Sequence, residues 1–182
     1  METINVPERN EVSENNQVIF DNLNSKLGFV PNLYATFAHS ETALGDYLTF
    51  QNRKSSLKAK EREVINLVVS QVNECEYCLA AHTALGKMNG FTDDQILEIR
   101  TGEAAFDAKI DALANFVRDI TVNRSKPSAE AVTRLFEAGY TKENLIDINM
   151  VIGDKIVSNF IHGSGQFAVD FPAAPKLEAE LV

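Results

Sequence analysis

The sequence has few basic residues and no long apolar run, and these absences exclude several classes of protein. Lys and Arg number 17 against 26 Asp and Glu, so the 182-residue chain has a formal net charge of −9. An acidic chain repels phosphate backbones and anionic lipid surfaces, so we expect no nucleic acid partner and no membrane partner. No segment approaches the ~20 apolar residues of a membrane-spanning helix. Residues 1–17 are polar and lack the pattern of a secretory signal, so we expect a cytoplasmic protein.

Cysteine and histidine are also scarce, with two and three residues respectively. Cys75 and Cys78 stand three positions apart, and His82 follows four residues later. In a cytoplasmic chain, two cysteines are more typical of redox or metal chemistry than of a structural disulfide framework. The chain is 45% hydrophobic and long enough to bury a core without disulfides, so we expect a single domain over residues 1–182.

The alternation of polar and apolar residues that marks a β-strand is missing, whereas helical punctuation recurs along the chain. Gly90 is suited to end one helix, and Thr92 with Gln95 forms a capping box for the next. The predicted helices span about 31–38, 41–54, 58–72, 75–89, 92–99, 108–122, 129–138 and 142–162. We therefore predict an all-α fold with an N-terminal arm at about 1–15 and an extended tail at about 168–182.

A duplicated helical unit is indicated when the sequence is shifted by 49 residues against itself. "GFTDDQILEI" (90–99) then aligns with "GYTKENLIDI" (139–148), and four earlier residues are also identical. The alternative is that two helix ends share the same Gly-aromatic-Thr chemistry. In the second copy the candidate reactive residues are absent, because Glu63, Cys75, Cys78 and His82 align with Ala112, Arg124, Pro127 and Ala131. We therefore expect any chemistry in the first unit.

On a helix, Cys75, Cys78 and His82 would occupy positions i, i+3 and i+7 and project from one face. Residues i and i+3 lie about 5–6 Å apart, which a disulfide tolerates, and the helix N-terminus favours a thiolate. Helix position alone does not decide which sulfur attacks a substrate. Cys75 is nearer the helix start, whereas Cys78 is one turn from His82, which could exchange protons with it.

Reduction of a hydroperoxide needs a thiolate and an acid that protonates the departing oxygen, and Glu63 on the preceding helix is the candidate to orient His82. Two other interpretations remain open. The thiols could simply fill a helix interface, or they could bind zinc together with His82 and Glu63. A thioredoxin-type site is not indicated, because the sequence has no βαβ pattern.

The spacing E-x11-C-x2-C-x3-H, from Glu63 to His82, resembles that of the alkylhydroperoxidase AhpD-like family of the carboxymuconolactone decarboxylase superfamily. The core motif covers about residues 57–100. "LGFVPNLYATFAHS" (27–40) and "DFPAAP" resemble segments of the peroxidase-related branch. The best-known members carry a histidine directly before the second cysteine, where this chain has Tyr77, and a phenol is a poor proton carrier at neutral pH.

The resemblance implies an all-helical homo-oligomer that reduces organic hydroperoxides or hydrogen peroxide through a dithiol–disulfide cycle. By motif position, Cys78 would be the peroxidatic cysteine and Cys75 the resolving one, with Glu63 and His82 as proton relay. An external dithiol would supply electrons, and no metal, haem or flavin is implied. Decarboxylase members lack the cysteine pair, which counts against lactone decarboxylation.

Two other functions fit the sequence, namely a thiol–disulfide exchange partner in a redox relay and a non-catalytic oligomeric binding or sensor module. His39 and His162 are interpreted as helix-end residues. Four residues before the core motif could line a substrate pocket or belong to the core: Phe29, Pro31, Tyr34 and Phe37. The Pro-containing tail suggests packing against a neighbouring copy.

Overall fold

The computed structural model describes residues 3–177, which form nine α-helices, one short 3-10 helix and no strand. The all-α prediction is confirmed. The helices are η1 (Arg9–Glu11), α1 (Glu14–Leu27), α2 (Asn32–Phe37), α3 (Ala43–Gln51), α4 (Ala59–Val72), α5 (Glu76–Met88), α6 (Asp93–Arg100), α7 (Ala108–Val122), α8 (Ala129–Glu137) and α9 (Lys142–Gly165).

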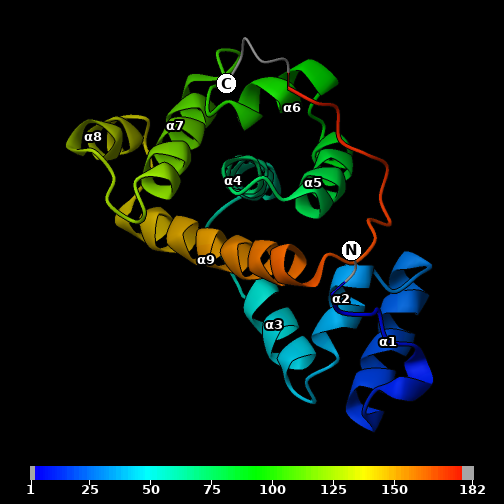
Figure 1. Cartoon of the computed structure of the whole chain (residues 1–182). Helices are drawn as coiled ribbons and strands as arrows, with labels where there is room; N and C mark the ends of the chain where they lie inside the picture. The colour runs from blue at the N-terminus through cyan, green and yellow to red at the C-terminus, as the bar shows by residue number, and fades with distance from the viewer. Residues whose placement is uncertain (1–2, 178–182) are drawn as a thin grey trace.

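Helix α4 is the centre of the molecule. Figure 1 shows it nearly end on, with α5, α6, α7 and α9 around it. Its middle is buried and, apart from Asn66, apolar, as expected of a helix surrounded by partners. The fully buried apolar residues are Val64, Ile65, Leu67, Val68 and Val69. The main hydrophobic core therefore forms where α4 meets α6, α7, α8 and α9.

The predicted repeat recurs as structure. Helices α4 and α7 begin 49 residues apart, as do α6 and α9, and both α6 and α9 start at a threonine capping box. Lys60 lies over the ring of Phe91, 4.8 Å from its centre, and Lys109 lies over Tyr140 at 4.5 Å. These two pairs are also related by the 49-residue shift. The two units therefore have equivalent contacts between helices in addition to similar helix ends. This favours a duplication over the alternative that two helix ends merely use the same Gly-aromatic-Thr chemistry.

The two units differ where the cysteines are. Helices α5 and α8 end 49 residues apart, but α8 begins four residues later than the shift requires. The missing turn contains Pro127, which disfavours helical conformation in the residue before it. The helix start that holds the cysteine pair is thus present only in the first unit.

Helices α1, α2 and α3 form a second hydrophobic cluster, which includes Cys75, Tyr77 and Cys78. Helix α1 was not predicted, because its sequence is mostly polar. Ser13 as N-cap and Gly28 at a positive φ of 83° were the available end signals. These N-terminal helices cover the start of α5, so the cysteines lie within this second cluster.

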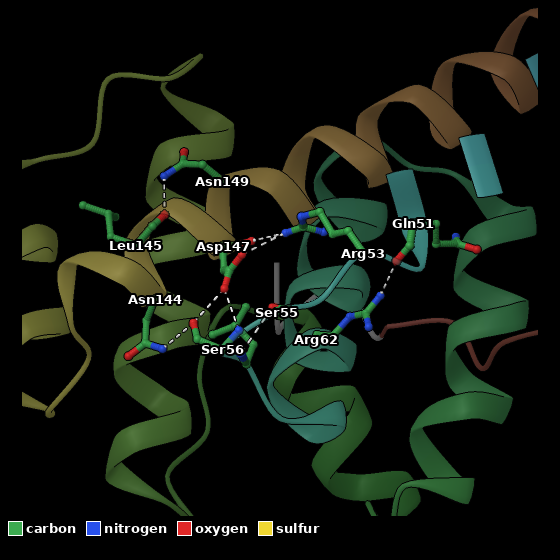
Figure 2. A network of polar contacts seen from close by, with 10 residues as sticks. Gln51, Arg53, Ser55, Ser56, Arg62, Asn144, Leu145, Asp147 and Asn149 are labelled. Atoms are coloured by element: carbon green, nitrogen blue, oxygen red, sulfur yellow. Dashed lines mark hydrogen bonds and ion pairs between the residues drawn. The ribbon is translucent and has the colours of Figure 1, made fainter. Parts of the chain in front are cut away.

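A polar network fixes the loop that joins α3 to α4 (Figure 2). Asp147 of α9 accepts hydrogen bonds from the backbone and side chain of Ser56, at 2.6 and 2.7 Å, and pairs with Arg53 at 3.3 Å. Arg62 of α4 donates to the carbonyl of Gln51 at 2.9 Å. The end of α3 is therefore attached to both α4 and α9, which positions the helices that cover the cysteines.

The C-terminal segment packs along its own chain as far as residue 177. Asp170 accepts a hydrogen bond from the Asn32 backbone at 2.7 Å, Phe171 packs against Phe29 and Tyr77, and Arg100 donates to the Pro175 carbonyl at 2.6 Å. The described part of the tail packs on its own chain, and its packing against a neighbouring copy stays a prediction. The rest of the predicted tail, 178–182, lies outside the described residues.

Across residues 3–177, none of the helices combines the length and hydropathy that a bilayer crossing requires.

Candidate active site

The cysteines lie at the first turn of α5 in a cap geometry. The helix begins at Glu76, so Cys75 is its N-cap, with φ −84° and ψ 97°, and Cys78 is the third helical residue. The expectation that Cys75 lies on the helical face is therefore wrong by one residue. An N-cap side chain points toward the third helical residue, and this geometry, rather than an i, i+3 face, brings the sulfurs together. Both cysteines are free thiols and buried.

Glu63 and His82 form a direct pair between α4 and α5. His82 Nδ1 lies 2.7 Å from Glu63 Oε2, and both side chains are about nine-tenths buried. Because a carboxylate only accepts, Nδ1 carries the hydrogen and Nε2 is left to exchange a proton. Burial raises the pKa of the Glu63 carboxyl, but the charge and hydrogen bond of His82, helped by Lys155, outweigh burial and lower it.

Cys78 is set up as the thiolate of the pair. A hydrogen bond from Cys75 is the largest cause that lowers the pKa of Cys78, burial opposes it, and the charges of Lys155 and His82 act with the hydrogen bond. Together they lower the pKa of Cys78 to about 5. The Ser158 hydroxyl lies 3.8 Å from the Cys78 sulfur and also stabilises the thiolate.

Cys75 keeps its proton. The same hydrogen bond to Cys78, together with burial, raises the pKa of Cys75. Its sulfur also lies 3.9 Å from Nδ1 of His162. The reduced pair therefore holds one proton, on Cys75, and one negative charge, on Cys78.

His162 is a site residue that the sequence did not reveal, since it was interpreted as a helix-end residue. It lies in the last turns of α9, is 9% exposed, and reaches the sulfur of Cys75. Three other buried polar residues of α9, Lys155, Ser158 and Asn159, also face this region. These residues lie in the part of α9 that continues beyond the repeated segment. The expectation that all the chemistry lies in the first unit is therefore incomplete.

Tyr77, at the position where the best-known AhpD-like proteins carry a histidine, contacts α2 and His162. Its side chain is 1% exposed, and its hydroxyl accepts a hydrogen bond from the Leu33 backbone at 3.2 Å, at the start of α2. Burial raises the pKa of Tyr77, so this phenol is further removed from proton transfer at neutral pH. Its ring packs against His162, with centroids 5.4 Å apart.

The other residues singled out in the sequence have separate positions. His39 is exposed and lies 2.8 Å from the Asn5 carbonyl, which fits its interpretation as a helix-end residue. Phe37 is buried and stacks on Tyr47 at 4.3 Å, whereas Phe29 is 39% exposed beside Phe171. Pro31 is buried, and Tyr34 is half-buried and donates to Gln51 at 2.6 Å. These residues belong to the second hydrophobic cluster or its edge.

No three His, Cys, Asp or Glu side chains converge as metal ligands in the part of the chain that the structure describes. The zinc alternative would need Cys75, Cys78, His82 and Glu63 to do so. What the site does offer is a thiolate, a thiol next to it and an imidazole–carboxylate pair, which together can perform two-electron thiol chemistry.

Residues 36–118 match the sequence model of the carboxymuconolactone decarboxylase family. A comparison with proteins of curated function found no match. Among solved structures, one similar protein is described as an alkylhydroperoxidase AhpD core, an uncharacterized peroxidase-related protein from Ralstonia eutropha JMP134. It has 20% identity and a TM-score of 0.79 over 99% of this chain and 94% of that chain.

Two further solved structures share the fold. An uncharacterized peroxidase-related protein from Silicibacter sp. TM1040 has 22% identity and a TM-score of 0.78, over 99% of this chain and 93% of that one. A cysteine-to-alanine variant of the debrominase Bmp8, in complex with 2,3,4-tribromopyrrole, has 14% identity and a TM-score of 0.76, over 93% of this chain and 92% of that one. Residues 36–118 thus match the carboxymuconolactone decarboxylase family, and the chain as a whole has the all-helical fold of the solved AhpD-like, peroxidase-related proteins.

Proposed function

We propose that this protein is a thiol peroxidase that reduces organic hydroperoxides or hydrogen peroxide with the Cys75–Cys78 pair. Cys78 is the peroxidatic cysteine, Cys75 the resolving cysteine, and Glu63 with His82 the proton relay. The observation that carries the proposal is the 2.7 Å contact between His82 and Glu63, beside a Cys78 whose thiolate is favoured by its surroundings.

The proposed reaction has two steps. The Cys78 thiolate attacks the distal oxygen of ROOH, the O–O bond breaks, and the departing alkoxide takes a proton from His82, which gives ROH and a sulfenic acid on Cys78. The Cys75 thiol then attacks that sulfenic sulfur, which releases water and forms the disulfide. Two electrons pass from the dithiol to the peroxide, and an external dithiol must return them.

The arrangement of protons supports this assignment of the two sulfurs. A peroxidatic cysteine must be ionised to react, and the pKa of Cys78 is lowered. A resolving cysteine can wait as a thiol, and the pKa of Cys75 is raised. Helix position alone left this choice open in the sequence.

The protein is proposed to act as a cytoplasmic homo-oligomer. Three exposed apolar residues of α9 support association, because Ile146, Val157 and Phe160 are 64%, 42% and 68% exposed on one helix. Light scattering is expected to give a mass well above the 20.1 kDa of one chain. A particle of one chain mass would contradict the oligomer and leave the peroxidase proposal standing.

The test is to treat the reduced protein with one equivalent of cumene hydroperoxide and to follow peroxide loss and intact mass. The wild type should lose about two mass units as the disulfide forms, and Cys75→Ser should trap an added oxygen on Cys78. Cys78→Ser should leave the peroxide unconsumed. Slow reaction of confirmed free thiols would favour the exchange partner or the binding module.

Parallel reaction with 2,3,4-tribromopyrrole tests for debromination, the chemistry that the structural similarity to the debrominase Bmp8 suggests.

A further inference from the structure

A polar pocket of about 290 Å³ opens beside Cys75, between the α4–α5 turn and the end of α9. Cys75 and His162 line it, whereas Cys78 does not. Cys78 is 1% exposed and lies behind Cys75, under the N-terminal helices. A molecule that enters this pocket therefore meets the sulfur of Cys75 first.

His162 is held in the tautomer that presents a base to this sulfur. Its Nε2 lies 3.2 Å from the Phe167 carbonyl, which can only accept, so the hydrogen of a neutral ring is on Nε2. Nδ1 is then a free acceptor, 3.9 Å from the Cys75 sulfur. An imidazole in this position can take a proton from an incoming thiol and return it to a departing one.

Asn159 lines the same pocket, where its side-chain amide opposes the rise in the pKa of Cys75. The residue is 4% exposed, and Asn73 donates to its carbonyl oxygen at 2.9 Å. Its Nδ2 is buried and makes no other hydrogen bond within residues 3–177. A buried donor left unpaired costs free energy, so a ligand atom or sulfur that accepts from Nδ2 would be stabilised here.

The rim of the pocket is acidic. Glu74 and Glu76 are both exposed and flank Cys75, and none of the pocket-lining residues, all within the described range, is Lys or Arg. Two carboxylates at the mouth repel anions and attract cations at short range. A negatively charged thiol would therefore reach Cys75 more slowly than a neutral or cationic one.

We propose, on the basis of the peroxidase cycle above, that the disulfide is reduced at Cys75 through this pocket by a dithiol without negative charge, with His162 as the catalytic acid–base. The leaving sulfur in such an exchange should be the one that is more stable as thiolate. In the reduced pair this is Cys78, and the charges of Lys155 and His82, which also lower its pKa, still act on Cys78 when Cys75 is in a mixed disulfide. Attack on Cys75 is therefore favoured for two reasons: its sulfur is the one that a donor in the pocket can reach, and Cys78 is the better leaving group.

The exchange takes place in two steps. His162 Nδ1 takes the proton of the first donor thiol, and the resulting thiolate attacks the Cys75 sulfur, which forms a mixed disulfide and releases Cys78 as thiolate. The second donor thiol loses its proton to solvent and attacks the donor sulfur of the mixed disulfide. Cys75 leaves and receives the proton from His162, so the donor becomes a cyclic disulfide and gives up two electrons.

The experiment measures reduction alone, on disulfide formed with diamide, so it stays informative even if the protein does not react with peroxides. Stopped-flow rates are compared for dithiothreitol, cationic cysteamine and anionic mercaptoethanesulfonate, each normalised to its rate with hydroxyethyl disulfide. His162→Ala should slow reduction by dithiothreitol about 100-fold, and added imidazole should restore much of the loss. His39→Ala is the control and should react at the wild-type rate.

Charge selection is tested with Glu74→Gln/Glu76→Gln against the distant, exposed pair Glu130→Gln/Glu137→Gln. The wild type should prefer cysteamine to the sulfonate about tenfold at low salt, and less at high salt. The first double variant should lose most of this preference, and the second should keep it. Equal rates for the two thiols at low salt would overturn the charge argument.

The attacked sulfur is identified in the wild type, without any variant. One equivalent of cysteamine, which has a single thiol, can form the mixed disulfide but cannot complete the reduction, and acid quenching with fragment mass spectrometry can locate the adduct. We expect the adduct on Cys75. An adduct on Cys78, or a His162→Ala variant that folds and reduces at the wild-type rate, would overturn the proposal.

Discussion

At the scale of single residues, the site depends on a few charges buried together between α4, α5 and α9. The site includes Glu63, His82 and Lys155. The charges of His82 and Lys155 lower the pKa of Cys78, and they also lower the pKa of the Glu63 carboxyl. All three are buried. In this low-dielectric setting each charge depends on its neighbours, so removal of one should change the reactivity of the others.

Glu63→Gln should lower the rate of hydroperoxide consumption by about 100-fold, because His82 loses the carboxylate that orients it and stabilises its charge. Breaking a buried pair should also cost about 3–5 kcal/mol of unfolding free energy. Initial rates with excess dithiothreitol and urea denaturation measure the two effects. Glu130→Gln, which changes an exposed carboxylate on α8, should match the wild type. A folded Glu63→Gln protein with full activity would contradict the relay.

Lys155→Met should raise the pKa of Cys78, since the ammonium charge is one of the causes that lower it. In the wild type, the ultraviolet absorbance of the thiolate should persist as pH falls and disappear near pH 5. In Lys155→Met the midpoint should move up by about one pH unit. Lys26→Met, on the exposed surface of α1, is the control, and Cys78→Ser should remove the transition. An unchanged midpoint would exclude Lys155 as a partner of the thiolate.

The same shift predicts how stability depends on pH. The folded state lowers the pKa of Cys78, so it binds this proton less tightly than the unfolded state does. The stabilisation is therefore complete above the ordinary thiol pKa of ~8.5 and is lost as pH falls through about 5. As pH falls from ~8.5 to about 5, the unfolding free energy of the reduced wild type should decrease more than that of Cys78→Ser. Urea denaturation at each pH measures both. A constant difference between the two proteins would contradict the lowered pKa.

At the scale of helices, the two related lysine–aromatic pairs make the duplication testable. Lys60→Met and Lys109→Met should each lower the unfolding free energy by about 0.5–1 kcal/mol, because each removes a cation from an aromatic face. Lys126→Met, at an exposed loop position, should have no such cost. Urea denaturation is the measurement. A loss in one variant only would mean that the two units do not use the pair in the same way.

Helix ends and spacings were predictable from sequence because their causes are local. Thr92 with Gln95 is a capping box in both the sequence and the structure, and Gly90 has the positive φ that its position suggested. By contrast, His162 contacts Cys75 across 87 residues. Only the packing of α9 against the α4–α5 turn creates that contact. The sequence did contain one signal for this contact. The helical spacing of the apolar face of α9 continues at positions 155, 158 and 162, which are polar instead of apolar.

At the scale of the whole molecule, the C-terminal segment holds the N-terminal helices over the site. Pro31 precedes α2 without a side-chain cap, and the Asp170 carboxylate accepts from the Asn32 backbone in its place. Sequence patterns could not show a cap supplied from 138 residues away. The same segment places Phe171 against Tyr77, next to the cysteines.

Asp170→Ala should therefore lower the unfolding free energy by about 0.5–2 kcal/mol, the usual cost of losing an N-cap. It should also speed alkylation of the cysteines by iodoacetamide, because α2 helps to cover them. Glu41→Ala, which changes an exposed carboxylate near α3, serves as the control. Unchanged stability and alkylation would show that α2 does not depend on this cap.

The position of the tail also has a consequence for biosynthesis. A ribosome makes the chain from its N-terminus, so Cys75 and Cys78 emerge long before α9 and the segment that includes Asp170 and Phe171. A nascent chain therefore has both thiols without the side chains that bury them and fix their protons. Translation must pass α9 and Phe171 before this dithiol is shielded, and oxidants in the cell meet it first as an unprotected pair.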